Sequence, residues 1–159
     1  MTRDAVSLAL ETAKKQSIPN AQQFEVSASE AGQHAMLERK WGLGSIRRTT
    51  PTPRYNCHGL AFASRRTCIF EGSTVALILV DDGYVEVPVA DVLPGDVVLY
   101  YDPDTGDAEH SGIVVEVPME GVLRIPIVCS KWGKYGEVLH RANNCPYNYS
   151  MARYFRCQP

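Results

Sequence analysis

The feature that most constrains this chain is a change of pattern near residue 73. Before it, three segments carry apolar residues at helical spacing. After it, short apolar runs alternate with turn sequences such as Asp81-Asp82-Gly83 and Leu93-Pro94-Gly95-Asp96. Helices followed by a series of short antiparallel strands are typical of an α+β fold. The chain has 159 residues, about the size of one domain.

The spacing predicts where the elements lie. Helices are expected at residues 2–17, 28–41 (capped by Ser27 or Ser29) and 56–68. Strands are expected at residues 75–80, 84–87, 97–101, 111–117, 123–129 and 151–157, the first two forming a hairpin. The N-terminal helices would pack on a small antiparallel sheet. We therefore expect a helical extension over residues 1–50 and the main unit over residues 51–159.

Charge and hydropathy exclude two classes of partner. Lys and Arg number 16 against 18 Asp and Glu, and the net charge of −2 lacks the basic excess of nucleic-acid binders. The longest apolar run, Val75–Val80, is far shorter than the ~20 residues of a membrane-spanning helix. The N-terminus lacks the continuous apolar centre of a secretory signal. We expect a cytoplasmic location, or export by a route without a cleavable signal, and neither a nucleic-acid nor a membrane partner.

The cysteines predict free thiols rather than a metal site or a disulfide framework. There are five, an odd number, and none forms a Cys-x-x-Cys pair. The aspartates near residue 104 resemble a calcium loop, but Pro103 and the lack of a glutamate at the twelfth loop position argue against an EF-hand. We expect no metal and no cofactor.

Two short segments carry the residues for covalent chemistry. Cys57 follows Asn56, a plausible N-cap, so its thiol lies where the helix dipole and unpaired N–H groups lower its pKa. His110 begins an apolar strand and can point along the sheet edge at a helix N-terminus. A thiolate beside an imidazole is the minimum for acyl transfer. The alternatives are an ordinary buried thiol and a histidine bound by a backbone carbonyl.

The same segments resemble a known family. Asn56-Cys57-His58-Gly59-Leu60-Ala61 resembles the Asp-Cys-Ser-Gly-Leu-Val element of the NlpC/P60 superfamily of papain-like cysteine peptidases and amidases. Residues 93–100 resemble its Pro-Gly-Asp strand, and residues 110–114 resemble its His-Val-Gly-Ile strand. The three elements occur in the family's order and span residues 54–117, less than half of the chain.

The resemblance implies a papain-like core over residues 51–159. It also implies that Cys57 is the nucleophile, that His110 is the base, and that the Cys57 N–H forms part of an oxyanion site. The substrate would be a peptide of the peptidoglycan type or another small amide. The alternatives are a cytosol-acting effector or toxin (a deamidase or protease on a host protein) and an inactive papain-like binding module. A protein target or an inhibitor is a further possible partner.

The chain departs from the family at several positions, as a divergent member would. Asn56 replaces an aspartate, and His58 replaces a small serine. His58 lines the cleft or, as its helix position favours, faces solvent. The family's third polar residue lies on the strand after that of His110, which by position gives Ser130. His140 and Asn143, in the following loop, are alternatives. His140 and Asn56 are also candidates for the cleft or the oxyanion site.

Two questions remain open from the sequence. The aromatic side chains of the last thirty residues could stack on a sugar or peptide, or could cover the end of the sheet; they are Trp132, Tyr135, Tyr147 and Tyr149. Residues 1–50 could block the cleft or pack behind the core, with Pro51-Thr52-Pro53 as a natural hinge.

Overall fold

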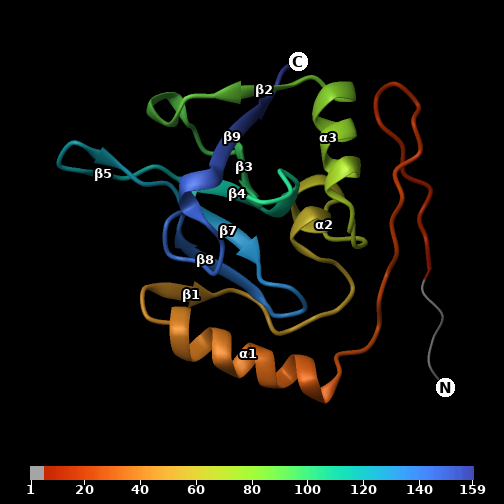
Figure 1. The fold of residues 1–159 in the computed structure, drawn as a ribbon, viewed down its shortest axis with the longest axis horizontal. Helices are drawn as coiled ribbons and strands as arrows, with labels where there is room; N and C mark the ends of the chain where they lie inside the picture. Colours follow the sequence, from red (N-terminus) through yellow and green to blue (C-terminus); the bar gives the residue numbers. More distant parts are fainter. Residues whose placement is uncertain (1–5) are drawn as a thin grey trace.

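The computed structural model describes residues 6–159. Its helices are α1 (Ala28–Trp41), α2 (Cys57–Phe62) and α3 (Gly72–Asp81), with 3₁₀ turns at Val89–Asp91 and Tyr149–Met151. Its strands are β1 (Ser45–Arg47), β2 (Tyr84–Val87), β3 (Val97–Tyr101), β4 (Ala108–Glu116), β5 (Met119–Glu120), β6 (Leu123–Arg124), β7 (Ile127–Lys131), β8 (Glu137–Arg141) and β9 (Ala152–Cys157). The α+β class expected from the sequence is confirmed (Figure 1).

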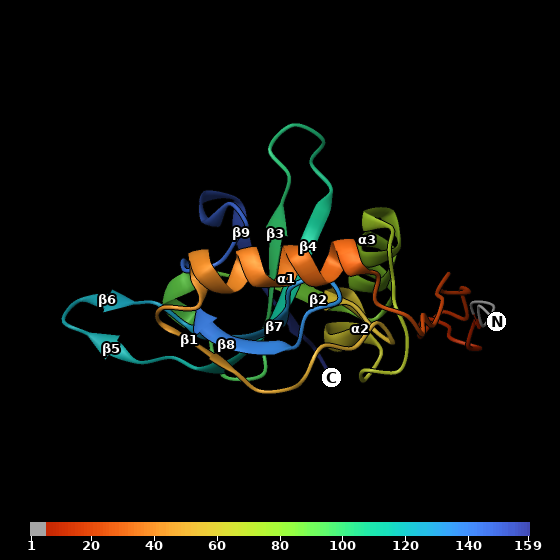
Figure 2. The ribbon, with the colours of Figure 1, turned by 90° about the horizontal axis from the view of Figure 1, so that it is seen from below.

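One antiparallel sheet organises the molecule. Its seven strands follow the order β1-β8-β7-β4-β3-β9-β2, and every neighbouring pair is antiparallel. The sheet is therefore larger than expected, and it includes β1 from the N-terminal part of the chain. The two-stranded β5–β6 ribbon projects from one side, and the β3–β4 turn projects from another (Figure 2). No helix within residues 6–159 has the length and apolarity to cross a membrane.

Alternation of side chains along the strands gives the sheet two apolar faces. We call the first the α1 face, because Leu37 and Trp41 of α1 pack against it; its buried residues include Val98, Tyr100, Val114, Val128 and Val138. The second, the α2 face, carries α2 and α3; its buried residues include Val97, Leu99, Ile69, Val75 and Ile78. Figure 2 shows α1 crossing one side of the strands, with α2 and α3 together at one end of the sheet.

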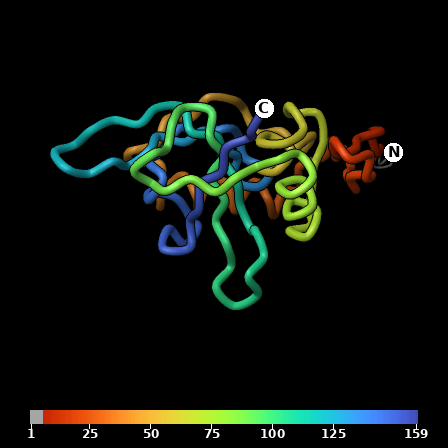
Figure 3. Tube along the Cα trace, turned by 90° about the horizontal axis from the view of Figure 1, so that it is seen from above, coloured from red at the N-terminus to blue at the C-terminus, as the bar shows by residue number. Residues whose placement is uncertain are grey.

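The prediction of a helix at residues 2–17 is wrong for residues 6–17, and residues 2–5 lie outside the described part of the chain. Residues 6–22 instead run out and back around a turn at Thr12–Lys15, along the edge of the molecule (Figures 1 and 3). Val6 bridges Gln22, and Ala21 bridges Cys68, so the backbone finds its partners across the chain. These distant partners replace the local hydrogen bonds that a helix would supply.

The strand expected at residues 75–80 is also wrong, because this run forms the middle of α3. Val75 and Ile78 are buried whereas Val80 is exposed, which is the three-residue period of a helix. A continuous apolar run of six does not distinguish a buried strand from a helix. The strand at Tyr84–Val87 is confirmed, but it pairs with β9 and not with residues 75–80.

Other boundaries are close to those expected. The helix at residues 28–41 is confirmed, and Ser27 is its cap: the Ser27 hydroxyl accepts from the Glu30 N–H at 3.2 Å. The helix expected at residues 56–68 ends at Phe62, because Ser64 and Arg65 take left-handed backbone angles with φ of 49° and 64°. The strand expected at residues 123–129 divides into β6 and β7 around Ile125-Pro126, where proline supplies no N–H.

Candidate active site

Cys57 is the first residue of α2, and Asn56 caps the helix. The Asn56 side-chain oxygen accepts from the Gly59 N–H at 2.9 Å and from the Ile69 N–H at 3.1 Å. Its amide donates to the Ile69 carbonyl at 2.7 Å, so one side chain fixes both the cap and the neighbouring loop. Gly59 permits this packing, since a Cβ there would lie 1.8 Å from the Thr67 carbonyl oxygen. The cap predicted for Asn56 is confirmed.

The Cys57 thiol is buried, with only 8% of the residue exposed, and it interacts with two imidazoles. Burial by itself raises the pKa of this thiol. The positive charges of His58 and His110 outweigh that effect and bring the pKa of Cys57 well below its ordinary value. Cys68, in contrast, is buried without such partners, and burial raises its pKa to about 11. The site therefore favours a thiolate at one of two neighbouring cysteines.

His110 is fully buried and is held by aromatic rings. Its ring stacks on Tyr147, with centroids 3.8 Å apart and planes 7° apart, and it leans on Tyr100 at 5.5 Å. A β-bulge in β4 at Glu109 immediately precedes it. In the part of the chain that the structure describes, neither ring nitrogen makes a hydrogen bond of regular geometry. The alternative of a histidine bound by a backbone carbonyl is therefore wrong.

His58 is buried rather than solvent-facing. Its Nδ1 lies 2.8 Å from the Ser111 hydroxyl oxygen, and its Nε2 lies 3.2 Å from the Ala108 carbonyl oxygen. Both partners belong to β4, the strand that carries His110. The two contacts tie α2 to this strand. This pairing has no local signal in the sequence, because the partners of His58 lie about fifty residues further along the chain.

Ser130 and His140 pair with each other. Their Oγ and Nε2 atoms are 2.6 Å apart, and His140 Nδ1 donates to the Arg141 carbonyl at 2.7 Å. A carbonyl only accepts, so Nδ1 carries the proton and the Ser130 hydroxyl donates to Nε2. Burial, together with the smaller effect of the His110 charge, lowers the pKa of His140 to about 4, so the ring is neutral at pH 7.

The expected hydrogen bond from a third polar residue to His110 is thus not formed by Ser130 or His140. Asn143, the other alternative, is exposed in the turn after β8. The side chain that fixes the plane of His110 is Tyr147, from the segment before β9. The sequence singled out Tyr147 as an aromatic residue, but contained nothing to indicate that it stacks on His110.

A pocket of about 430 Å³ opens above Cys57. Asn56, Cys57 and Cys68 line it from the α2 side, and Trp132 and Tyr147 line it from the sheet side. A further wall comes from residues 23–37, through Gln23, Glu30, Gln33, His34 and Leu37. An ion pair of 2.8 Å between Glu30 and Lys134 holds this wall to the β7–β8 turn. Part of the N-terminal segment therefore forms one side of the pocket, rather than packing behind the core.

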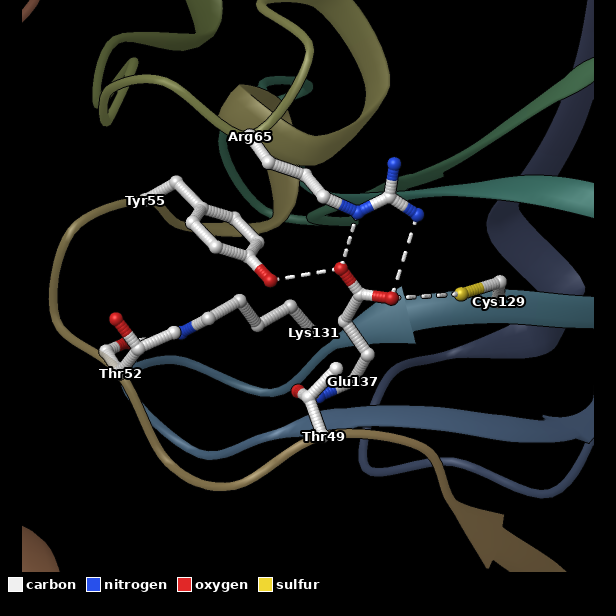
Figure 4. A network of polar contacts seen from close by, with 7 residues as sticks. All are labelled: Thr49, Thr52, Tyr55, Arg65, Cys129, Lys131 and Glu137. Carbon is white, nitrogen blue, oxygen red and sulfur yellow. Dashed lines mark hydrogen bonds and ion pairs between the residues drawn. The ribbon is translucent and has the colours of Figure 1, made fainter.

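A buried carboxylate on the α2 face anchors both ends of α2 (Figure 4). Glu137 of β8 accepts from the Tyr55 hydroxyl at 2.7 Å and from the Arg65 guanidinium, and the Cys129 thiol lies 3.6 Å away. The Thr49 hydroxyl accepts from the Glu137 N–H at 2.8 Å. Burial raises the pKa of Glu137, but these donors outweigh it and the pKa is lowered.

Lys131 is a second buried charge beside this network. Its Nζ donates to the carbonyls of Thr52 and Gly133 at 2.6 and 2.7 Å and lies 5.1 Å from the centre of the Tyr55 ring. Burial lowers the pKa of Lys131 to about 8. With Glu137, Lys131 fixes the loop that leads into Cys57 against strands β7 and β8.

Comparison of the chain with models of protein families, with curated proteins and with solved structures gives no match. Among residues 6–159, no group of three or more His, Cys, Asp or Glu side chains has a geometry that could hold a metal ion. The function is therefore inferred from the geometry of the site around Cys57.

Proposed function

We propose that this protein is a papain-like thiol hydrolase that cleaves amide or peptide bonds, with Cys57 as nucleophile and His110 as acid and base. One observation carries the proposal. A thiol with a lowered pKa lies at a helix N-terminus on the floor of a pocket, beside an imidazole whose nitrogens make no hydrogen bond of regular geometry within residues 6–159. Perturbed nucleophiles in such pockets are typical of active sites.

The chemistry follows from these groups. The Cys57 thiolate attacks the carbonyl carbon of the substrate, and the Cys57 N–H, at the start of α2, faces the developing oxyanion. The C–N bond breaks as protonated His110 gives its proton to the leaving amine. Water then attacks the thioester and loses a proton to His110. The carboxylic acid leaves, and the Cys57 thiolate with its charged His110 is restored.

We propose a short peptide of the peptidoglycan type as the substrate. The pocket volume of about 430 Å³ suits a few residues of peptide, and Trp132, Tyr147 and Leu37 offer apolar walls for its side chains. An amide of a host protein and binding without turnover are the competing functions. The steps above need no metal ion and no cofactor.

Site-resolved alkylation with iodoacetamide at about pH 6 tests the thiol–imidazole pair. Cys57 should be labelled, whereas Cys68, which lines the same pocket with its pKa raised to about 11, should not. Cys68 is thus an internal control for access. Labelling of Cys57 should slow in His110→Ala, which removes one of two neighbouring positive charges, and persist in Cys68→Ala. If Cys57 were as slow as Cys68 at this pH, the proposed mechanism would be wrong.

Turnover is tested separately, with peptidoglycan fragments and then with protein amides. Cys57→Ala should abolish hydrolysis while leaving binding of the same fragments intact. Full hydrolysis by Cys57→Ala would exclude a thiol mechanism. Binding without hydrolysis by the unaltered protein, across all fragments, would establish the binding module instead.

A further inference from the structure

His58 is the second imidazole beside Cys57, and its hydrogen bonds differ in kind from those of His110. Both nitrogens of His58 are engaged by β4, at 2.8 Å to Ser111 and 3.2 Å to Ala108, and 3% of the residue is exposed. Both nitrogens of His110 lack regular partners within residues 6–159. One ring is therefore fixed at both ends, and the other is free to exchange protons.

The partners of His58 allow it to hold a proton without losing a contact. The Ala108 carbonyl only accepts, so Nε2 carries a hydrogen in either charge state. The Ser111 hydroxyl donates to Nδ1 when the ring is neutral and accepts from it when the ring is charged. A buried charge normally costs free energy unless hydrogen bonds satisfy it. Here both states are satisfied.

We propose that the two imidazoles divide the work of the site: His58 is a positioning residue that holds a fixed positive charge beside the Cys57 thiolate, while His110 transfers the protons. This inference rests on the proposed function, because it assigns roles within the same reaction. Ser111 is the group that lets His58 carry the charge.

The charges around the pair agree with this division. Within residues 6–159, the titratable groups that interact with Cys57 include His58, His110, Lys131, Cys68 and Tyr147. For His58 itself, burial lowers the pKa, but the Cys57 thiolate and the Ala108 carbonyl raise it above its ordinary value. Lys131 donates to the Thr52 and Gly133 carbonyls, and the charge that lowers the pKa of Cys57 most is that of His58.

Two reactions of Cys57 separate the two roles. Alkylation by iodoacetamide requires only the thiolate, so its pH profile reports the pKa of Cys57. Acetylation by p-nitrophenyl acetate leaves a thioester on Cys57 and releases p-nitrophenolate. Hydrolysis of that thioester forms acetate and requires a base to take a proton from water. The rate of this second step therefore reports proton transfer.

His58→Gln should change the first reaction and spare the second. Each unit of increase in the thiol pKa lowers the thiolate fraction about tenfold, so we expect alkylation at pH 6 to fall about tenfold or more and to recover above pH 9. Thioester hydrolysis should stay within about twofold of the unaltered protein. His110→Gln should instead slow that hydrolysis by about a hundredfold.

Ser111→Ala provides a second route if His58→Gln fails to fold. Loss of the hydroxyl leaves Nδ1–H without an acceptor, so alkylation at pH 6 should fall several-fold with no change in thioester hydrolysis. Thr67→Val is the matched control, since it removes another buried hydroxyl, one that donates to the Asn20 side chain at 2.9 Å. Its alkylation profile should equal that of the unaltered protein.

The outcomes distinguish the two proposals. If the unaltered Cys57 is unreactive at pH 6, the proposed function fails and this inference fails with it. If Cys57 is reactive but His58→Gln, or Ser111→Ala in its place, leaves the alkylation profile unchanged, only the role of His58 is wrong. Slow thioester hydrolysis in His58→Gln would also overturn it, because His58 would then transfer the proton.

Discussion

Replacing Glu137 by glutamine should destabilise the protein strongly for a change of one atom. The carboxylate is buried, with 2% of the residue exposed, and it accepts from Tyr55, Arg65 and Cys129. Glutamine keeps one oxygen as an acceptor but loses the charge. Arg65 donates to both carboxylate oxygens, so the new N–H₂ group faces a guanidinium N–H, which cannot accept from it, at either position.

The magnitude follows from these contacts. A hydrogen bond to a charged group contributes about 1.5–3 kcal/mol, and an unsatisfied buried donor costs about 1–3 kcal/mol. Arg65 is 48% exposed, so its share is screened to about 1 kcal/mol or less. We expect a loss of about 3 kcal/mol, which corresponds to a fall of about 6–12 °C in Tm for a domain of this size.

Urea unfolding followed by tryptophan fluorescence measures this loss. Glu38→Gln is the matched control, because the Glu38–Arg47 pair is exposed on both sides and should contribute less than about 0.5 kcal/mol. A double-mutant cycle with Tyr55→Phe should give a coupling energy of about 1–2 kcal/mol. A loss for Glu137→Gln no larger than that of Glu38→Gln, or a coupling of zero, would refute the reasoning.

Three further predictions concern His140, Tyr147 and Gly59. The pKa of His140 is about 4 in the folded protein and near 6.5 in the unfolded chain. The free energy of unfolding should therefore fall by about 3 kcal/mol as the pH drops from 6.5 to 4. His140→Gln should flatten this pH dependence in urea titrations. Tyr147→Phe retains the stack on His110, so its Cys57 should be alkylated at the same rate as in the unaltered protein. Alkylation of Cys57 in Tyr147→Ala should be several-fold slower at pH 6. Equal rates in the two variants would contradict a positioning role for Tyr147. Gly59→Ala places a Cβ 1.8 Å from the Thr67 carbonyl oxygen and should cost more than about 3 kcal/mol by the same unfolding assay, while a near-neutral effect would show that the loop yields.

Elements with local signals were predictable from the sequence. Ser27 and Asn56 mark the starts of α1 and α2 because a side-chain oxygen satisfies N–H groups within one turn. The turn glycines at positions 83 and 95, with φ of 72° and 95°, likewise mark chain reversals. Such signals operate within a few residues, so they do not depend on the rest of the fold.

Elements made by distant pairing were not predictable. β1 consists of Ser45, Ile46 and Arg47, with Ile46 mostly exposed, and only its pairing with β8 makes it a strand. Val75–Val80 has the composition of a strand, but the segment folds as part of α3, with one side of the helix buried and the other exposed. In both cases tertiary contacts outweigh the local preference.

The site shows the same division. Cys57 and His110 follow from their own motifs, and the structure brings them together. Glu137 and Lys131 could not be foreseen, since charged residues are rarely buried without partners and those partners lie on other strands and loops. The alternation of β7 and β8 places Ser130 and His140 on one face, close enough to pair with each other.

The two faces of the sheet explain why the expected third residue does not hold His110. His110, Ser130 and His140 all lie on the α1 face, and the Ser130 proton is already directed to His140. A stack on Tyr147 fixes the plane of the imidazole without selecting which nitrogen carries the proton, and burial raises the pKa of Tyr147, so its ring remains neutral. On this arrangement His110 needs no carboxylate or amide to orient it, because the stack supplies the orientation and the α2 face supplies the anchors for Cys57.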